Sequence, residues 1–246
     1  HVKFPGAKRF SVEGGDASII SLDMVVDESS ASGAQEAVIG LAHRGRLSTL
    51  TKVMKKPYRA IFSEFMGSSA FPSDLGVAGD VKYHMGYSSD IVTPEGNKVH
   101  LKLAPNPSHL EAVNPVVEGF IRAKIDHEHK SDAKKALPIL IHGDAAVAGQ
   151  GIVYEVTQMA GLKGYNTGGT IHFVINNQVG FTTDFDDART SIYCTDVAKI
   201  IDAPVIHVNG DNAEAVVFAA KLAAEFRQKF SKDIFVDMVC YRRHGH

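Results

Sequence analysis

The chain has 246 residues, of which 44% are hydrophobic and 22% charged, and its formal net charge at pH 7 is −2. This apolar content suffices for a packed core in one large or two small domains, and it excludes a disordered chain. The nearly balanced charge and the lack of a run of Lys and Arg argue against nucleic-acid binding. No apolar stretch is long enough to cross a bilayer, so we expect no membrane-spanning segment.

Cysteine usage and the two ends of the sequence set further limits. Cys194 and Cys240 lie far apart and outside any Cys-x-x-Cys spacing. They therefore indicate neither a zinc site nor a disulfide framework, and they favour a reducing compartment. The sequence begins at His1 and ends at His246, shortly after a predicted strand. We expect a segment of a longer chain, truncated at both ends.

The amino-terminal part predicts a loop, a strand and two helical stretches. Residues 3–16 are loop-like, and residues 17–26 are amphipathic. Ala37–Ala42 is an apolar run typical of a buried strand, and the basic turn His43-Arg44-Gly45-Arg46 follows it. Residues 47–55 have helical spacing. A basic turn at the carboxyl end of a strand is a place where an anionic ligand can bind.

The next part of the chain is richer in turns. Residues 66–79 read as a surface loop, Val99–Leu103 as a short strand, and residues 104–111 as a proline-bounded turn into a helix. Residues 128–135 are charged and predict a solvated surface. The motif Asp126-His127-Glu128-His129 has metal-binding residue types, but without a further partner it favours a surface position.

Two apolar runs that end in polar turns stand at the centre of the chain. Pro138–Ile141 breaks at Gly143-Asp144, and Ile171–Ile175 breaks at Asn176-Asn177. Residues 150–162 between them have helical spacing, which predicts a right-handed crossover and two parallel strands. Asp144 and Asn177 should then leave the same edge of the sheet, where open α/β sheets bind ligands.

The carboxyl-terminal part repeats the alternation of strand and helix. Residues 204–208 and 235–240 predict strands, and Asp211 or Asn212 is expected to cap a long helix with Ala219, Ala223, Phe226 and Phe230 on one face. The pattern predicts an α/β fold, with a mostly parallel sheet and helices on both faces. We expect residues 1–246 to form a single domain.

The polar turns at the sheet edge predict a metal site. The Asp144 carboxylate, the Asn177 carboxamide and the carbonyl of Val179 are hard oxygen ligands suited to Mg²⁺, which fills its remaining positions with water and phosphate oxygens. Taken separately, each turn also fits an ordinary structural role, with Asp near a helix N-terminus and Asn in a plain turn. The combination favours a site for a phosphorylated ligand.

The order of these motifs resembles the thiamine diphosphate enzymes, although Ala145 stands where their Gly-Asp-Gly motif has its second glycine. The variant Gly-Asp-Ala-Ala, followed by Gly-Gln-Gly and Asn-Asn-Gln-Val-Gly-Phe-Thr-Thr, is similar to the decarboxylating components of 2-oxoglutarate dehydrogenase. The resemblance covers essentially the whole chain. It implies a thiamine diphosphate-binding fold in which this chain is the diphosphate-binding domain. The pyrimidine-binding domain, with its activating Glu, lies outside the sequence.

The resemblance also assigns residues to cofactor and substrate, because the motifs AHRGR, KYHMG and NPSHLE occur together in family order. Each histidine taken alone would fit a core or turn position. The implied metal ligands are Asp144, Asn177 and Val179. The implied cofactor-binding residues are Arg44, Ser108, Leu110, Asp144, Ala145, Ala146 and Asn177. The implied substrate-binding residues are His43, His84 and Ser108, and His43 and His84 are also implied to be catalytic.

The implied activity is the oxidative decarboxylation of 2-oxoglutarate, with thiamine diphosphate and Mg²⁺ as cofactors. The succinyl group passes to the lipoyl group of a dihydrolipoyl succinyltransferase, as the first step of the 2-oxoglutarate dehydrogenase complex in the citric acid cycle. A homodimer is implied for the full-length protein, and the isolated segment is expected to be inactive. The ending Tyr241–His246 is closer to bacterial members, which favours the bacterial cytoplasm over the mitochondrial matrix.

Three alternatives accompany this interpretation. A 2-oxoadipate-type homologue would share nearly every motif, and a thiamine diphosphate-binding module without catalytic activity would share the cofactor residues. A nicotinamide-binding Rossmann domain is suggested by Gly149-Gln150-Gly151. It fails on spacing, since the third glycine position is Tyr154 and the glycines follow the turn instead of opening it.

Overall fold

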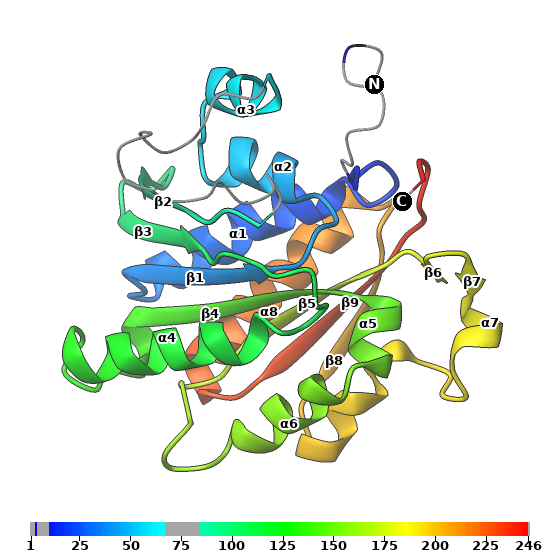
Figure 1. The fold of residues 1–246 in the computed structure, drawn as a ribbon. Helices are drawn as coiled ribbons and strands as arrows, with labels where there is room; N and C mark the ends of the chain where they lie inside the picture. The colour runs from blue at the N-terminus through cyan, green and yellow to red at the C-terminus, as the bar shows by residue number, and fades with distance from the viewer. Residues whose placement is uncertain (1–2, 4–9, 67–83, 246) are drawn as a thin grey trace.

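A seven-stranded sheet forms the centre of the molecule (Figure 1). The computed structural model describes residues 3, 10–66 and 84–245. The strand order across the sheet is β2-β3-β1-β4-β5-β9-β8. The strands are β1 (Glu36–Leu41), β2 (Tyr87–Val92), β3 (Lys98–Leu103), β4 (Ala136–Gly143), β5 (Ile171–Asn176), β8 (Val205–Asn209) and β9 (Ile234–Val239).

Five of the six strand pairings in this sheet are parallel, which confirms the predicted α/β fold class. The exception is the edge strand β2, which pairs antiparallel with β3. The sequence analysis missed β2, because two serines and an aspartate dilute its alternation. The turn between β2 and β3 carried a signal in Pro94-Glu95-Gly96, where Gly96 adopts a φ of 88°.

Helices cover both faces of the sheet (Figure 1). On one face, α1 and α8 pack against each other and against the sheet, and α4, α5, α6 and η4 cover the other face. The helices are α1 (Ala17–Ala31), α2 (Arg46–Ser48), the π-helix η1 (Thr49–Val53), α3 (Tyr58–Phe65), α4 (Asn114–His127), η3 (Ala133–Lys135), α5 (Asp144–Gly149), α6 (Gly151–Met159), α7 (Phe185–Ala188), η4 (Cys194–Ile201) and α8 (Ala213–Phe230), and a small hairpin joins β6 (Val179–Gly180) to β7 (Thr183–Asp184).

The core lies on both sides of the sheet, because neighbouring residues of a strand point to opposite faces. In β5, Phe173 and Ile175 pack in the cluster that contains α1 and α8, whereas Val174 packs with α5, α6 and η4. Every residue of β1 and of β5 is buried. This is the pattern of parallel strands covered on both faces, and it explains why the sequence shows continuous apolar runs there.

The predicted helices needed correction at three places. The helix expected at residues 150–162 is α6, which ends at Met159, and a helix that was not expected, α5, precedes it and is separated from it by the extended Gln150. The stretch at residues 47–55 forms α2 and a π-helix. Asn212 caps α8, since its Oδ1 accepts a hydrogen bond from the Ala215 N–H at 3.0 Å. Phe230 does not share the buried face of α8, because its side chain is 53% exposed.

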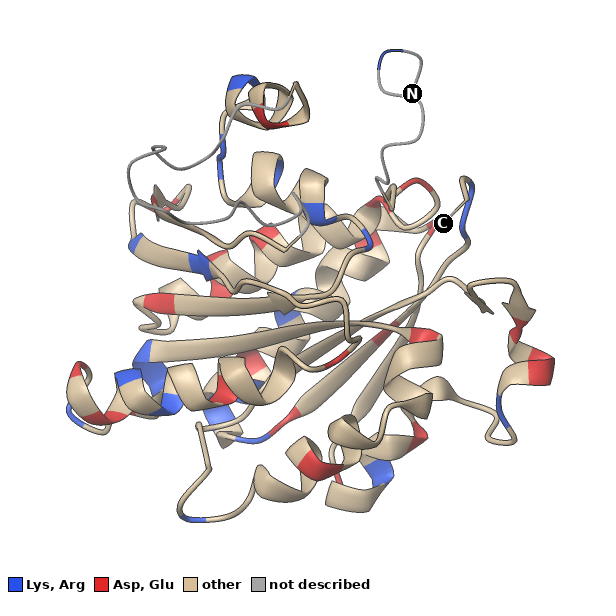
Figure 2. Cartoon of the chain, viewed as in Figure 1, with Lys and Arg blue, Asp and Glu red and all other residues tan. Residues whose placement is uncertain are grey.

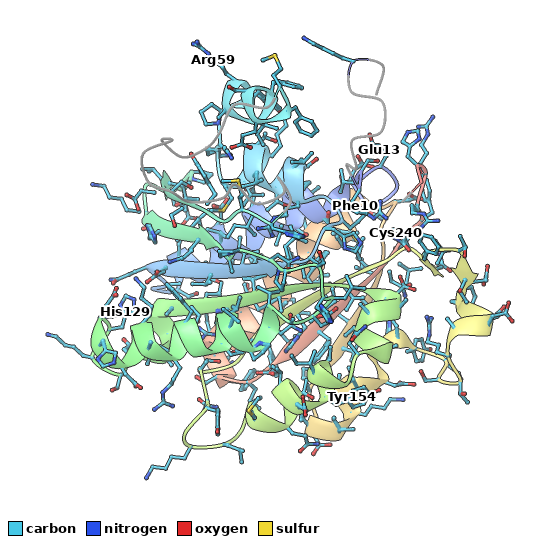
Figure 3. All side chains as sticks on the ribbon, viewed as in Figure 1. Phe10, Glu13, Arg59, His129, Tyr154 and Cys240 are labelled. Atoms are coloured by element: carbon cyan, nitrogen blue, oxygen red, sulfur yellow. The ribbon has the colours of Figure 1, made fainter. Side chains whose placement is uncertain are left out.

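Several surface predictions can also be compared with the structure. His129 lies at the far end of α4 (Figure 3), and its Nε2 is 3.5 Å from a Glu36 oxygen. The described residues contain no cluster of three His, Cys, Asp or Glu that suits a metal ion. None of the helices described is long and apolar enough to span a membrane. Residues 67–79, from the predicted loop, lie outside the described residues.

Candidate functional site

A cavity of about 620 Å³ opens at the carboxyl ends of the central strands. His43 and Arg44, which follow β1, line it together with Asp144 after β4, Asn177 after β5, and Leu110. Asp144 and Asn177 leave the same edge of the sheet, as the sequence predicted, and the turn after β1 and Leu110 lie at this cavity too. The cavity therefore brings together chain segments that are distant in sequence.

Asp144 is the first residue of α5 and follows β4 without an intervening loop. Its side chain lines the cavity, yet the residue is only 2% exposed. Burial raises the pKa of the Asp144 carboxyl, while neighbouring backbone N–H groups and the Arg189 guanidinium act in the opposite direction. A buried carboxylate at the wall of an open cavity gains most from a bound cation, which restores the solvation it has lost.

The two asparagines after β5 have different environments. The Nδ2 of Asn176 donates a hydrogen bond to Asp237 at 3.0 Å, which fixes it inside the protein. Asn177 lines the cavity, and its Oδ1 accepts a hydrogen bond from the Val179 N–H at 3.3 Å. Since Gly143 pairs with Ile175 in the sheet register, Asp144 and Asn177 leave neighbouring strand ends.

This donor set fits a hard divalent cation. A carboxylate, a carboxamide and a backbone carbonyl, from Asp144, Asn177 and Val179, belong to residues that line one cavity. Such oxygens are the ligands of Mg²⁺, which keeps several positions for water or phosphate oxygen. The structure thus brings together all three residues predicted to bind the metal.

The hairpin of β6 and β7 packs closely over the start of α5. A Cβ atom added at Gly180 would lie 2.6 Å from the Cβ of Ala145, so this position requires glycine. Ala145 and Ala146 both line the cavity. The methyl group of Ala145 is accommodated because Gly180 carries no side chain.

Two arginines make part of the cavity wall positive. The Arg44 Nη1 donates to the carbonyl of Ser11 at 3.0 Å, and the Arg242 Nη2 donates to the carbonyl of Phe181 at 2.8 Å. Burial and the neighbouring charge of Arg242 lower the pKa of Arg44. Two cations held near each other favour an anionic ligand between them.

The predicted histidines occupy two separate places. His43 lines the cavity, and its ring centroid lies 4.6 Å from that of Phe10. The His84 Nε2 lies 3.3 Å from the Ser108 Oγ, so this predicted pair is brought together. Neither His84 nor Ser108 contributes to the cavity lining, in contrast to His43 and Leu110.

The sequence analysis missed a buried pair in the cavity wall. The Glu111 Oε2 lies 2.6 Å from the His142 Nδ1, and both residues line the cavity. Burial favours a raised pKa for Glu111, but His142 and Asn114 outweigh it and the pKa is lowered. The sequence signal for this pair was His142, a histidine at the end of the otherwise apolar run of β4.

A second missed residue is Arg189, which follows α7. Its side chain is 10% exposed, and its Nη1 lies 3.6 Å from the Asp144 Oδ2. Within residues 10–66 and 84–245, the Nε and Nη1 of Arg189 have no hydrogen-bond partner. Nothing in the local sequence pattern pointed to this residue.

The Gly149-Gln150-Gly151 motif does not form a dinucleotide-binding turn. Gly149 ends α5 and Gly151 begins α6, whereas the turn from strand to helix is at Gly143-Asp144. A Cβ atom at Gly149 or Gly151 would meet no atom within 4 Å. The glycines are therefore not required by a close backbone approach, and the Rossmann alternative is excluded.

Comparison with known proteins places this site in a family. Residues 5–246 match the family described as the dehydrogenase E1 component. The chain belongs to this family. Similar relatives are the 2-oxoglutarate dehydrogenase E1 components of Rickettsia conorii, at 57% identity over 246 residues, and of Brucella ovis, at 54% over 254 residues. The mitochondrial 2-oxoglutarate dehydrogenase of Dictyostelium discoideum is 52% identical over 246 residues.

Each of these E1 alignments covers 100% of this chain but only 24–26% of the relative. The chain therefore spans about a quarter of the length of the curated relatives it matches. The cavity, the Asp144 turn and the Asn176-Asn177 turn all lie inside that quarter. The E1 family thus accounts for the fold and for the resemblance found in the sequence.

Proposed function

We propose that this chain is the diphosphate- and metal-binding domain of a 2-oxoglutarate dehydrogenase E1 component. The whole protein would decarboxylate 2-oxoglutarate and transfer the succinyl group to the lipoyl group of a dihydrolipoyl succinyltransferase, as the first step of the complex in the citric acid cycle. The observation that carries this proposal is the shared cavity lined by Asp144, Asn177 and Val179, in a chain whose relatives bear that name.

Mg²⁺ and the cofactor diphosphate would bind at the start of α5. Asp144 and Asn177 supply side-chain oxygens to Mg²⁺, and Val179 supplies its carbonyl oxygen. The first backbone N–H groups of a helix have no helical acceptor, so those of Ala145 and Ala146 can donate to phosphate oxygens. When bound, thiamine diphosphate supplies the electron sink that decarboxylation of a keto acid needs.

The remaining cavity residues would hold the rest of the cofactor and the substrate. Arg44 and Leu110 line the cavity beside the metal ligands and would contact the cofactor. His43 would donate a hydrogen bond to the distal carboxylate of 2-oxoglutarate, because imidazole can donate and can carry charge near neutral pH. His84 and Ser108, which lie 3.3 Å apart, would complete the binding of that carboxylate, with Ser108 also near the cofactor.

The chain alone would not turn over substrate. The proposal assigns residues 1–246 to a single diphosphate-binding domain, with the pyrimidine-binding domain, its activating Glu and the homodimer contacts in the rest of the protein. The curated relatives include bacterial components and a mitochondrial protein. They are compatible with either of the compartments expected from the sequence.

The proposal is tested by the release of CO₂ from the full-length protein with thiamine diphosphate and Mg²⁺. We expect 2-oxoglutarate to be preferred over 2-oxoadipate by about 10-fold or more, since a pocket distinguishes one methylene by about 10–200-fold. A reversed preference would assign the protein to the 2-oxoadipate class. Cofactor binding without CO₂ release from either acid would identify a non-catalytic module.

A further inference from the structure

Arg189 has hydrogen-bonding donors that the described part of the protein does not satisfy. Its side chain is 10% exposed, and its Nε and Nη1 are buried without a hydrogen-bond partner among the residues that the structure describes. The ring of Phe185 lies 5.5 Å from the guanidinium, which supplies a contact but no acceptor. Buried donors are nearly always satisfied in folded proteins, so unpartnered ones point to a ligand.

The position of Arg189 connects it to the proposed metal site. Its Nη1 lies 3.6 Å from the Asp144 Oδ2, which is an ion-pair distance but too long for a good hydrogen bond. Asp187 and Ala188, immediately before it, line the cavity. The α7 segment is otherwise acidic, as Figure 2 shows at this edge of the molecule, with Asp184, Asp186 and Asp187.

A divalent cation bound to Asp144 would lie close to the Arg189 guanidinium. Two positive charges would then share one carboxylate in a buried place, where charges repel more strongly than in water. A diphosphate beside the cation offsets this repulsion, because its negative oxygens can accept hydrogen bonds from the Arg189 donors. Guanidinium groups suit phosphate oxygens in both charge and geometry.

We propose that Arg189 makes cation binding at Asp144 depend on diphosphate: the guanidinium competes with the cation for Asp144 and turns to the diphosphate when both ligands bind. The inference rests on the proposed function. It adds a cofactor-binding residue outside the Gly-Asp and Asn-Asn turns. Coupling between two ligands is reciprocal, so Arg189 should weaken the binding of the cation alone and strengthen that of the diphosphate.

The test measures the two ligands separately in the full-length protein. Binding of Mn²⁺ alone is followed by electron paramagnetic resonance, and binding of thiamine diphosphate at saturating Mg²⁺ is followed by calorimetry. In Arg189→Gln we expect the Kd of Mn²⁺ to fall about 10-fold and the Kd of thiamine diphosphate to rise about 10-fold, within the usual range of coupling between sites. Unchanged values, or both ligands binding more weakly, would overturn the inference.

Three further variants separate the possible causes. Arg189→Lys keeps the charge but loses the planar donors, so Mn²⁺ should stay weakly bound while thiamine diphosphate affinity is not restored. Arg122→Gln removes another arginine, paired with Asp126 at 2.9 Å, and should leave both affinities unchanged. If Asp144→Asn does not weaken Mn²⁺ binding, the metal site itself is wrong. If it does and Arg189→Gln has no effect, only the inference about Arg189 fails.

Discussion

Two groups of buried polar side chains in this molecule differ in whether their hydrogen bonds are complete. The first group, the interior chain, starts at the cavity wall and continues beneath α4 and α6. It links Glu111 to His142 at 2.6 Å, His142 to His172 at 3.0 Å, and His172 to Asp233 at 3.2 Å. Asn114 donates to Glu111 at 2.7 Å. Both nitrogens of each histidine in the interior chain have a polar partner.

The second group, the cavity rim, consists of Arg44, Asn176 and Arg189. Each is largely or partly buried, and each has at least one buried polar atom without a hydrogen-bond partner in the described part of the chain. These atoms are the Nε of Arg44, the Oδ1 of Asn176 and the Nε and Nη1 of Arg189. All three residues lie beside the Asp144 and Asn177 turns or at the cavity they line.

The two groups differ in whether the protein alone can satisfy their polar atoms. A buried polar network stabilises a fold only when its members are satisfied, because a lone buried polar group costs free energy. The interior chain meets that condition and holds α4, β4 and β5 together. The cavity rim does not meet it, which is expected where a ligand supplies the missing partners.

The largest expected effect comes from interrupting the interior chain. His172→Phe keeps the stacking on Phe235, whose ring centroid lies 4.1 Å away, but removes the hydrogen-bond partner of the His142 Nε2 and of the Asp233 Oδ2. Burial lowers the pKa of His172, so the lost contacts are mainly hydrogen bonds of a neutral ring. We expect the free energy of unfolding to fall by about 2–4 kcal/mol, measured by urea denaturation.

A matched control makes the same change at an exposed histidine. The side chain of His100 is 41% exposed, and its Nδ1 lies 2.7 Å from Asp90 on the sheet edge. His100→Phe should change the free energy of unfolding by about 0.5 kcal/mol or less, because exposed ion pairs contribute little. Equal losses in the two variants would contradict the role given to the interior chain.

A somewhat smaller effect should appear in the pH dependence of stability. Burial and the nearby charge of Asp233 raise the pKa of Glu118 from 4.5 to about 7, against hydrogen bonds from Thr167 and Thr170. The folded protein therefore holds this proton between pH 4.5 and 7 while the unfolded chain has released it. Stability should fall as pH rises through that window and then level off, by at most about 3 kcal/mol.

The measurement for Glu118 is urea denaturation at pH values from 5 to 8. Glu118→Gln removes the titrating group and keeps an oxygen near Thr170, so its profile should be flatter than that of the wild type. The two profiles would diverge most above pH 7, where the wild-type side chain is ionised. Parallel profiles over the whole range would show that Glu118 titrates normally.

The smallest expected effect concerns the β6 hairpin, which also lines the cavity. Gly180→Ala places a methyl group 2.6 Å from the Ala145 Cβ and should push the β6 hairpin away from α5. We expect Mn²⁺ affinity to fall about 10-fold, as for other residues that orient metal ligands. Gly149→Ala, where the added atom meets open space, is the control and should bind Mn²⁺ like the wild type. Equal Mn²⁺ affinities in the wild type, Gly180→Ala and Gly149→Ala would show that Gly180 has no effect on metal binding.

The sequence predicted the parallel part of the sheet because buried strands are visible as apolar runs ended by polar turns. It could not predict β2, whose side chains alternate between half-buried and exposed. It also placed the helical spacing after β4 at residues 150–162, whereas the first helix there, α5, begins at Asp144. Local patterns thus showed which segments are buried but not where a helix begins.

The same limit applies to the candidate site. Asp144, Asn177 and Val179 could be found because short turns with fixed residue types follow two predicted strands. Arg189 and the pair of Glu111 with His142 depend on contacts between segments distant in sequence, which no local spacing encodes. Candidate ligands that belong to a motif were therefore predictable, whereas residues held by a tertiary contact were not.

The central claim, that Asp144 and Asn177 hold the cofactor's divalent cation, is tested most directly by crystals of the full-length protein grown with thiamine diphosphate and Mn²⁺. The account predicts an anomalous scattering peak at about 2.0–2.3 Å from the Asp144 carboxylate, the Asn177 Oδ1 and the Val179 carbonyl oxygen. A peak bound to other residues, with Asp144 and Asn177 outside its coordination shell, would contradict the account.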